Sequence, residues 1–279
     1  MPVIDYLIVG VVTKDVTADG YTIGGTVTYA GLTAARLGAR VAVVTSASDD
    51  LDLPAHMPGV ELRTVKSEYT TTFINTYDAR GNRTQRLLAR SSQIRAEDVP
   101  VEWRDARIVH LAPLAAEFGP ELVTAFPRAG VLGVTPQGWM RAWDATGVVS
   151  PIPPPQFTAA ERARVDAVIF SDADFGHRWD EIERFAASTN LSIVTQGDRG
   201  ARLYASVAWE DFPAYAAVPL DPTGAGDVFA AAFLYAWERT GDRREAVDFA
   251  NCVASFSIED VGTTSLPDSA AIQARRQQR

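Results

Sequence analysis

The chain has 279 residues, 47% of them hydrophobic and 22% charged, and its formal net charge is −9, a composition ordinary for a soluble globular protein with a large core. The acidic balance argues against a nucleic-acid-binding surface, which needs clustered Lys and Arg. Cys252 is the only cysteine, which excludes an internal disulfide and favours a reducing cytoplasm, and we expect neither a signal peptide nor a membrane-spanning segment.

The first part of the chain shows the rhythm of strand, helix and strand. Residues 6–12 and 41–45 read as buried strands, and residues 27–37 read as a helix that opens after Gly24 and Gly25. Asp15 follows the first strand, at the end where open α/β sheets bind ligands. From position alone, Asp15 is either an acceptor of hydrogen bonds from ligand hydroxyls or an ordinary turn acid.

Strands of a second kind follow. Residues 17–23 form a short hairpin around an Asp19-Gly20 turn, and residues 60–65, 71–78 and 84–88 are rich in β-branched and aromatic side chains. A turn is predicted at residues 79–82, so the pattern is that of a meander and not of parallel units.

The second half returns to the alternating pattern. Strands are predicted at 107–112, 130–135, 165–170, 191–195 and 215–220, and helices from Asp227 onward and over 243–259. Alternation of this kind predicts a mainly parallel sheet with helices packed against it.

The turn before the helix at Asp227 carries the chemistry. Gly224 and Gly226 let the backbone turn sharply and let a ligand approach main-chain amides at the positive end of a helix, which is an anion site. A carboxylate beside such a site repels a resident anion. It is useful if the anion is a phosphoryl group in transit and Asp227 takes the proton of the attacking hydroxyl. The alternative is an Asp that only caps the helix.

The run from Asp221 to Asp227, with its apolar flanks, resembles the signature of the ribokinase-like (pfkB-type) carbohydrate kinases. This resemblance implies a ribokinase-like three-layer α/β/α sandwich with a mainly parallel central sheet and a small, reduced β lid. It implies a single domain over residues 1–279 with lid strands at about 12–23 and 60–90. The short chain and residues 137–141 look most like the myo-inositol kinase branch, and a sugar or a nucleoside stays open as the acceptor.

The same resemblance assigns roles to particular residues. Asp227 is implied as the catalytic base, and the amides of Gly224, Ala225 and Gly226 as the anion hole. ATP and Mg²⁺ are the implied cofactors, with Asp174 reaching the metal through water, and a monovalent cation such as K⁺ stays open. The residues implied to contact the acceptor are Asp15, Gly24 and Gly25. Those implied to contact the nucleotide are Thr195, Gly197, Gly200, Thr223, Asn251 and Gly262.

Two positions depart from the family pattern, because Tyr29 and Ser171 stand where the family usually has Asn. The main alternative function is a non-catalytic sugar or nucleotide sensor on the same fold. A nicotinamide oxidoreductase is disfavoured, since Gly10 has no glycine-rich turn after it. We therefore expect a cytoplasmic kinase, monomeric or homodimeric, whose partner is a small-molecule alcohol and neither nucleic acid nor a membrane.

Overall fold

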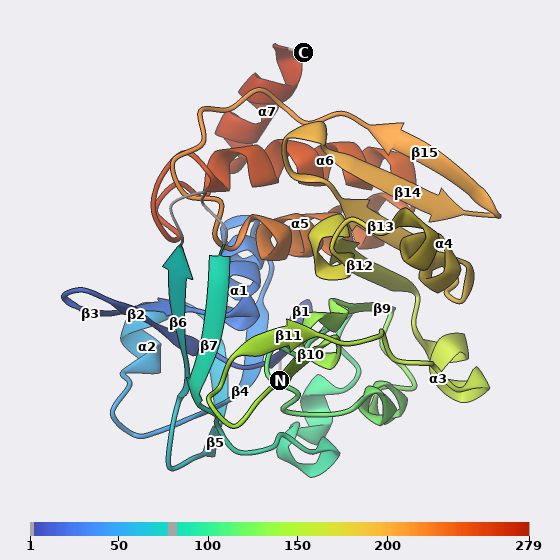
Figure 1. The fold of residues 1–279 in the computed structure, drawn as a ribbon. Helices are drawn as coiled ribbons and strands as arrows, with labels where there is room; N and C mark the ends of the chain where they lie inside the picture. The colour runs from blue at the N-terminus through green and yellow to red at the C-terminus, as the bar shows by residue number, and fades with distance from the viewer. Residues whose placement is uncertain (1–2, 78–82, 279) are drawn as a thin grey trace.

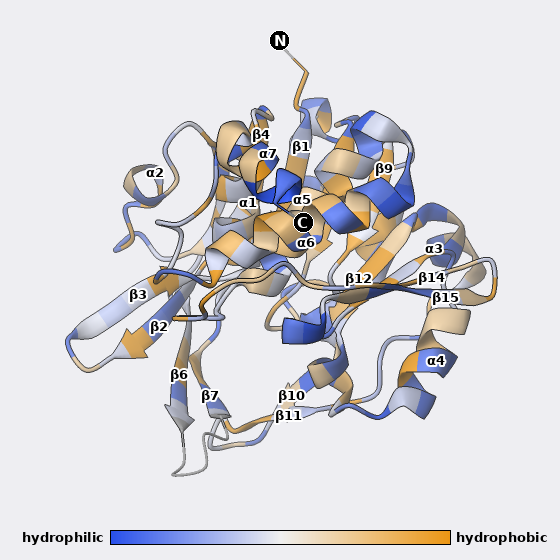
Figure 2. Cartoon of the chain, turned by 90° about the horizontal axis from the view of Figure 1, so that it is seen from above, coloured by the Kyte–Doolittle hydropathy of each residue, from blue (hydrophilic) through white to orange (hydrophobic). Residues whose placement is uncertain are grey.

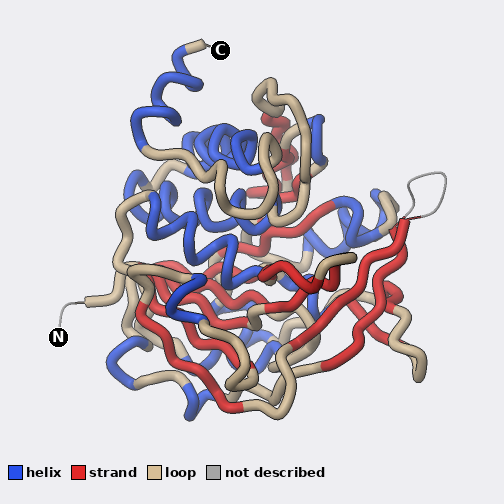
Figure 3. The backbone as a smooth tube through the Cα atoms, turned by 90° about the vertical axis from the view of Figure 1, so that its left-hand side faces the viewer, coloured by secondary structure: helices blue, strands red, loops and turns tan. Residues whose placement is uncertain are grey.

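The computed structural model describes residues 3–77 and 83–278 and has the layered α/β/α architecture shown in Figures 1 and 3. Its centre is a nine-stranded sheet with the order β15-β14-β13-β12-β9-β8-β1-β4-β5. The strands are β1 (Tyr6–Gly10), β4 (Val41–Ala47), β5 (Glu61–Lys66), β8 (Ile108–Ala112), β9 (Val131–Val134), β12 (Ala167–Ser171), β13 (Ser192–Thr195), β14 (Ala201–Ala205) and β15 (Ala208–Phe212).

The direction of the strands confirms the mainly parallel sheet. Every neighbouring pair from β5 to β13 is parallel, and β14 and β15 extend the sheet antiparallel. The strands at the centre are buried on both faces, which explains why they read as continuous apolar runs. Their carboxyl ends therefore share one edge of the sheet, where the sequence places its polar turns.

Helices cover both faces of this sheet. They are α1 (Thr26–Arg36), α2 (Leu53–His56), α3 (Ala159–Arg164), α4 (Trp179–Ala187), α5 (Ala225–Thr240), α6 (Arg243–Ser257) and α7 (Ser269–Gln277). Alternate residues of β1 enter two cores: Ile8 packs with α1, α5 and α6, whereas Leu7 packs on the other face with α4. Helix α5 is largely buried between the sheet and its neighbouring helices, and Figure 2 shows the hydrophobic colouring of this central region.

A separate four-stranded sheet projects from the body and forms the lid (Figures 1 and 2). Its strands, in the order β3-β2-β6-β7, are β2 (Thr13–Thr17), β3 (Gly20–Gly24), β6 (Thr71–Tyr77) and β7 (Arg83–Ala89). The first strand predicted within residues 60–90 does not join it. That strand, β5, instead pairs parallel with β4 at the edge of the main sheet, because β4 leaves an open edge there.

One predicted strand is absent. Residues 213–219 belong to no helix or strand, although the sequence predicted a strand over 215–220. Pro213 and Pro219 remove two backbone donors from this segment. Its beginning is held by Asn251, whose side-chain amide donates to the carbonyls of Phe212 and Pro213. The turn predicted at 79–82 lies outside the described residues.

A small hairpin docks against the lid. Strands β10 (Arg141–Trp143) and β11 (Val149–Pro151) pair antiparallel, and the loop between them reaches β7. The amide of Leu87 donates to the carbonyl of Gly147 at 2.8 Å, and the Arg86 guanidinium donates to the carbonyl of Thr146 at 2.7 Å. The lid and this hairpin are therefore one connected structure.

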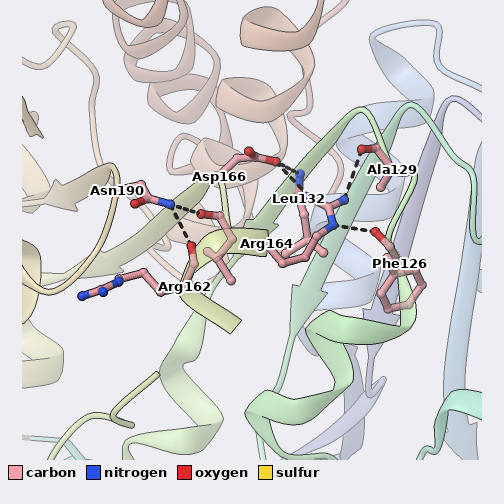
Figure 4. Close-up of polar contacts among 8 residues, drawn as sticks. Phe126, Ala129, Leu132, Arg162, Arg164, Asp166 and Asn190 are labelled. Atoms are coloured by element: carbon pink, nitrogen blue, oxygen red, sulfur yellow. Dashed lines mark hydrogen bonds and ion pairs between the residues drawn. The ribbon is translucent and has the colours of Figure 1, made fainter. Parts of the chain in front are cut away.

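The opposite end of the sheet is fastened by Arg164 (Figure 4). Its guanidinium donates to the carbonyls of Phe126 and Ala129 and lies 3.3 Å from a carboxylate oxygen of Asp166, which in turn accepts from the amide of Leu132. These bonds tie the amino-terminal ends of β9 and β12 together, away from the edge that carries the polar turns. Within the described part of the chain, no helix is both long and apolar enough to span a bilayer.

Candidate active site

A cavity of about 650 Å³ lies along the carboxyl edge of the sheet, between the lid and the amino terminus of α5. Lid residues line one end, and the segment after β15 together with α6 lines the other. Predicted residues from distant parts of the sequence meet in this cleft. They are Asp15, Gly25, Thr195, Gly197, Gly200, Thr223, Gly224, Ala225, Gly226, Asp227 and Asn251.

Three predicted residues do not line the cavity: Gly24, Asp174 and Gly262. Gly24 is buried behind Asp15, and a Cβ added to it would lie 2.3 Å from the Asp15 carboxylate. Gly25 has a φ of 90°, and an added Cβ would lie 2.4 Å from the carbonyl oxygen of Val11. The glycine pair thus lets α1 begin close to β1 and β2, in addition to bordering the cleft at Gly25.

The turn before α5 has the geometry of an anion site. Gly224 adopts the left-handed conformation, with φ 78°, and α5 begins at the next residue. The first-turn amides of a helix have no carbonyl partner within it, and Gly226 and Asp227, which belong to this turn, line the cleft. The amide of Ala225 also contacts the carbonyl of Pro222, at 3.3 Å, and is partly occupied.

Asp227 lies in this first turn, half-buried at the base of the cleft. Burial raises the pKa of its carboxyl group from 3.8 to about 7, and the charge of Asp174 adds to the rise. A hydrogen bond from the Thr26 hydroxyl and the positive charge of Arg141 act in the opposite direction. A carboxylate with a pKa near neutrality is suited to accept a proton at physiological pH.

The sequence analysis missed Thr26, although it directly follows the glycine pair. It is the first residue of α1, and its hydroxyl fixes the orientation of the Asp227 carboxylate. Arg141 was noted only as part of a stretch and given no role. The signal that could have indicated both is their position directly after turns at the carboxyl edge of the sheet.

Tyr29, the first departure from the family pattern, has a packing role. An added Cβ at Gly224 would lie 2.3 Å from the Cδ1 atom of the Tyr29 ring, so the ring occupies the space above the anion turn. Burial raises the pKa of the Tyr29 hydroxyl, and the nearby carboxylates of Asp221, Asp15 and Asp227 raise it further. Tyr29 is therefore a neutral side chain among acids.

The far end of the cleft is a mainly apolar slot. It is bordered by Ala214, Ala216, Ala217, Ala254 and Ile258. The hydroxyl of Tyr215 donates to Asp248 at 3.0 Å, which ties the wall of the slot to α6. At Gly200, with φ 93°, a Cβ would lie 2.1 Å from the carbonyl oxygen of Phe212, so only glycine lets the turn after β13 pack here.

Asp174, the predicted metal residue, is already hydrogen-bonded on both oxygens. One accepts from the amide of Ser171 and the other from the side-chain amide of Gln137 at 3.1 Å. No group of three or more His, Cys, Asp or Glu suited to a metal occurs among the described residues. Each carboxylate oxygen has a second lone pair, so Asp174 fits a role through water and not direct coordination.

The adjacent Asp172 has a different function. It is buried and accepts a hydrogen bond from Arg199 at 2.5 Å, which joins the turn after β12 to the turn after β13. Ser171, the second departure from the family pattern, caps this turn by accepting from the amide of Ala173. The two turns are thus held together by an ion pair whose carboxylate is buried and whose guanidinium is exposed.

Comparison with known proteins agrees with this geometry. Residues 172–270 match the model of the pfkB family carbohydrate kinases. A nucleoside kinase of Methanothermobacter thermautotrophicus is 34% identical over 119 residues, which cover 37% of each chain. The aligned segment thus spans little more than a third of that relative.

Solved structures resemble the whole chain. A pyrophosphate-dependent myo-inositol-1 kinase, studied for its conversion into a myo-inositol-3 kinase, superimposes with a TM-score of 0.78 at 20% identity and covers 96% of this chain and 98% of its own. The ribokinase of Thermotoga maritima gives a TM-score of 0.74 at 19% identity, and the superposition covers 98% of this chain and 99% of the ribokinase.

The fold is accordingly that of the ribokinase-like proteins, with a cleft at the carboxyl edge of a mainly parallel sheet. The match to the pfkB family of carbohydrate kinases covers residues 172–270, and over the whole chain the likeness is one of fold.

Proposed function

We propose that this protein transfers the terminal phosphoryl group of ATP to an alcohol group of a sugar, a polyol such as myo-inositol, or a nucleoside. The observation that carries the proposal is Asp227, a carboxylate with a pKa of about 7 in the first turn of the helix whose amides face the same cleft. A base beside an anion site is what phosphoryl transfer to a hydroxyl requires.

The lid end of the cleft has the polar groups that an alcohol needs. Asp15 on β2 and the amides of Asn75 and Gln85 line it, beside the apolar Phe73 and Leu114. The Gln85 amide donates to Asn75 at 3.1 Å, and its own oxygen is buried with no partner in the described structure. A ligand hydroxyl would satisfy that oxygen, since an unsatisfied buried acceptor costs about 1–3 kcal/mol.

The apolar slot favours ATP over pyrophosphate as the donor. The related myo-inositol-1 kinase is pyrophosphate-dependent, so the fold accommodates either donor. Pyrophosphate would leave the slot beside Ala216 and Ile258 empty, whereas an adenine ring would bury against it. Comparing turnover with ATP and with pyrophosphate, at equal concentrations, tests this choice directly.

In this mechanism Asp15 orients the acceptor and Asp227 takes the proton of its hydroxyl. The oxygen then forms a bond to the terminal phosphorus, and the electron pair of the broken bond leaves with ADP. Mg²⁺ bound to the donor would neutralise phosphate charge, with Asp174 placed to bond one of its waters. Thr26 keeps the Asp227 carboxylate in position throughout.

The decisive experiment is ATP turnover with a panel of polyols, sugars and nucleosides. Acceptors are first chosen by thermal shift in the presence of a non-hydrolysable ATP analogue, because a ligand that binds only the native state raises the apparent stability. If acceptors bind but none is phosphorylated with either donor, the alternative of a non-catalytic sensor on the same fold replaces the kinase.

Asp15→Ala is expected to raise the acceptor KM by about 10- to 100-fold, because a hydrogen bond to a charged group is worth about 1.5–3 kcal/mol. The KM for ATP should stay unchanged, since Asp15 belongs to the lid end. Asp19→Ala, which removes the same charge from the exposed hairpin turn, is the control. A fall in ATP affinity with normal acceptor affinity would show that the two ends are assigned the wrong way round.

Asp174→Asn is expected to raise the Mg²⁺ concentration needed for half-maximal activity and to lower kcat, because the charge that faces the metal's water is lost. The asparagine oxygen can still accept from the Ser171 amide, so the turn should survive. Mg²⁺ titrations of the variant and the wild type measure the effect. Identical titrations would mean that the phosphates alone hold the metal.

A further inference from the structure

Arg141 is the only positively charged side chain among the described residues that line the cleft. The acids Asp15, Asp198 and Asp227 line the same cavity, in a chain with a net charge of −9. An anionic donor with several negative charges therefore enters a site whose own side chains carry more negative than positive charge. The amides of the α5 turn offset part of that repulsion, and Arg141 is the remaining source of positive charge.

The backbone around Arg141 is firmly held. The preceding turn is anchored by the amide of Gly138, which donates to the carbonyl of Pro113 at 2.8 Å, and by the indole of Trp139, which donates to the carbonyl of Phe118 at 2.7 Å. Residue 141 itself begins β10 and pairs with Pro151. The backbone that carries Arg141 therefore needs little reordering when an anion binds.

Arg141 also lies near the point of chemistry. It comes after β9, in the middle of the sheet, and lines the same cavity as Gln137, Ser171 and the α5 turn. Its charge is close enough to Asp227 to lower the pKa of that carboxyl group. A guanidinium has a planar fork of donors that matches two phosphate oxygens.

We propose that Arg141 and the first-turn amides of α5 together form the binding site of the phosphoryl group that is transferred. This inference rests on the proposed kinase function. The guanidinium remains protonated and donates to the terminal phosphate oxygens, while Asp227 accepts the proton of the attacking hydroxyl. Arg141 therefore recognises the third phosphate of the donor and contributes nothing to the first two.

The test compares ADP with a non-hydrolysable ATP analogue, AMP-PNP, by calorimetry in the presence of Mg²⁺. Arg141→Met should weaken AMP-PNP binding by about 10- to 100-fold, the effect of losing a charge-assisted hydrogen bond pair, and change ADP binding by less than about threefold. Arg128→Met removes an exposed arginine outside the cleft and should change neither affinity.

The pH profile supplies a readout that a purely structural role would not move. In Arg141→Met the acid limb of kcat/KM should shift to higher pH, because the charge that lowers the Asp227 pKa is lost. Arg141→Lys keeps the positive charge but loses the planar pair of guanidinium donors. The acid limb of its kcat/KM profile should therefore stay at the wild-type pH while kcat falls about 10-fold or more.

Three outcomes would overturn the proposal. Equal losses for ADP and AMP-PNP would place Arg141 on the inner phosphates or in the fold. If nucleotide binding were unchanged and the KM rose for an acceptor that already carries a phosphate group, Arg141 would belong to the acceptor site. In the third, the wild type binds neither nucleotide, and the proposed function and this inference fail together. By contrast, a wild type that binds AMP-PNP but phosphorylates no alcohol contradicts only the acceptor part of the proposed function, and the comparison of ADP with AMP-PNP still tests Arg141.

Discussion

Asp227→Asn is expected to lower kcat by about 10²–10⁴-fold, the usual scale for loss of a general base. ATP affinity should change by less than about threefold, because the anion site is made of backbone amides that the substitution leaves in place. In the wild type, kcat/KM should rise with pH through about 7, where burial has moved the pKa of Asp227. Steady-state kinetics from pH 5 to pH 9 measure both effects, and near-normal turnover by the variant would remove Asp227 from the mechanism.

The same substitution should raise stability at alkaline pH. The folded pKa of about 7 lies above the ordinary value of 3.8, so the folded protein holds a proton that the unfolded chain has lost. Stability from this group is therefore present at acid pH and lost as the pH rises from about 4 to about 7. The Tm of Asp227→Asn relative to the wild type should increase over that window. A variant that is less stable at pH 8 would contradict this assignment of the pKa.

Gly224→Ala is expected to lower kcat/KM by about 10²-fold or more, because displacement of catalytic groups by about 1 Å has effects of this size. Two causes combine at this position. The φ of 78° is unfavourable for alanine, and the new Cβ would lie 2.3 Å from the Tyr29 ring. Either the turn or the ring must move, and both border the anion site. The free energy of unfolding should fall by about 2–4 kcal/mol from strain and overpacking.

Gly241→Ala separates these causes. Gly241 ends α5 with a φ of 70°, and an added Cβ there meets no atom within 4 Å. Its loss of stability, about 1 kcal/mol, measures the backbone strain alone. In the Gly224→Ala background, Tyr29→Ala should restore the stability lost to the clash with the ring but not the stability lost to backbone strain at residue 224. If Gly224→Ala lost no more stability than Gly241→Ala and kept its activity, the Tyr29 ring would not constrain the anion turn.

The place of the candidate site could be predicted because its most specific part is local. Residues Asp221 to Asp227 are contiguous, so their glycines, the helix start and the acid appear together in the sequence and in the structure. The central parallel strands of the main sheet were predicted correctly for a related reason: burial on both faces requires unbroken apolar runs. The strand predicted over residues 215–220 was wrong, because apolar residues of this segment line the cleft and do not pair in a sheet.

What only the tertiary structure decided is how distant segments meet. The order of strands places β1 between β4 and β8 and β9 next to β12, and this brings the Thr26 hydroxyl to Asp227 and Arg141 into the same cleft. The same assembly put β5 in the main sheet and paired Gln85 with Asn75 across the lid. A local pattern specifies the period and polarity of each element, because those depend on neighbouring residues. It does not specify which edges pair, since that choice depends on the burial and hydrogen bonding of the whole chain.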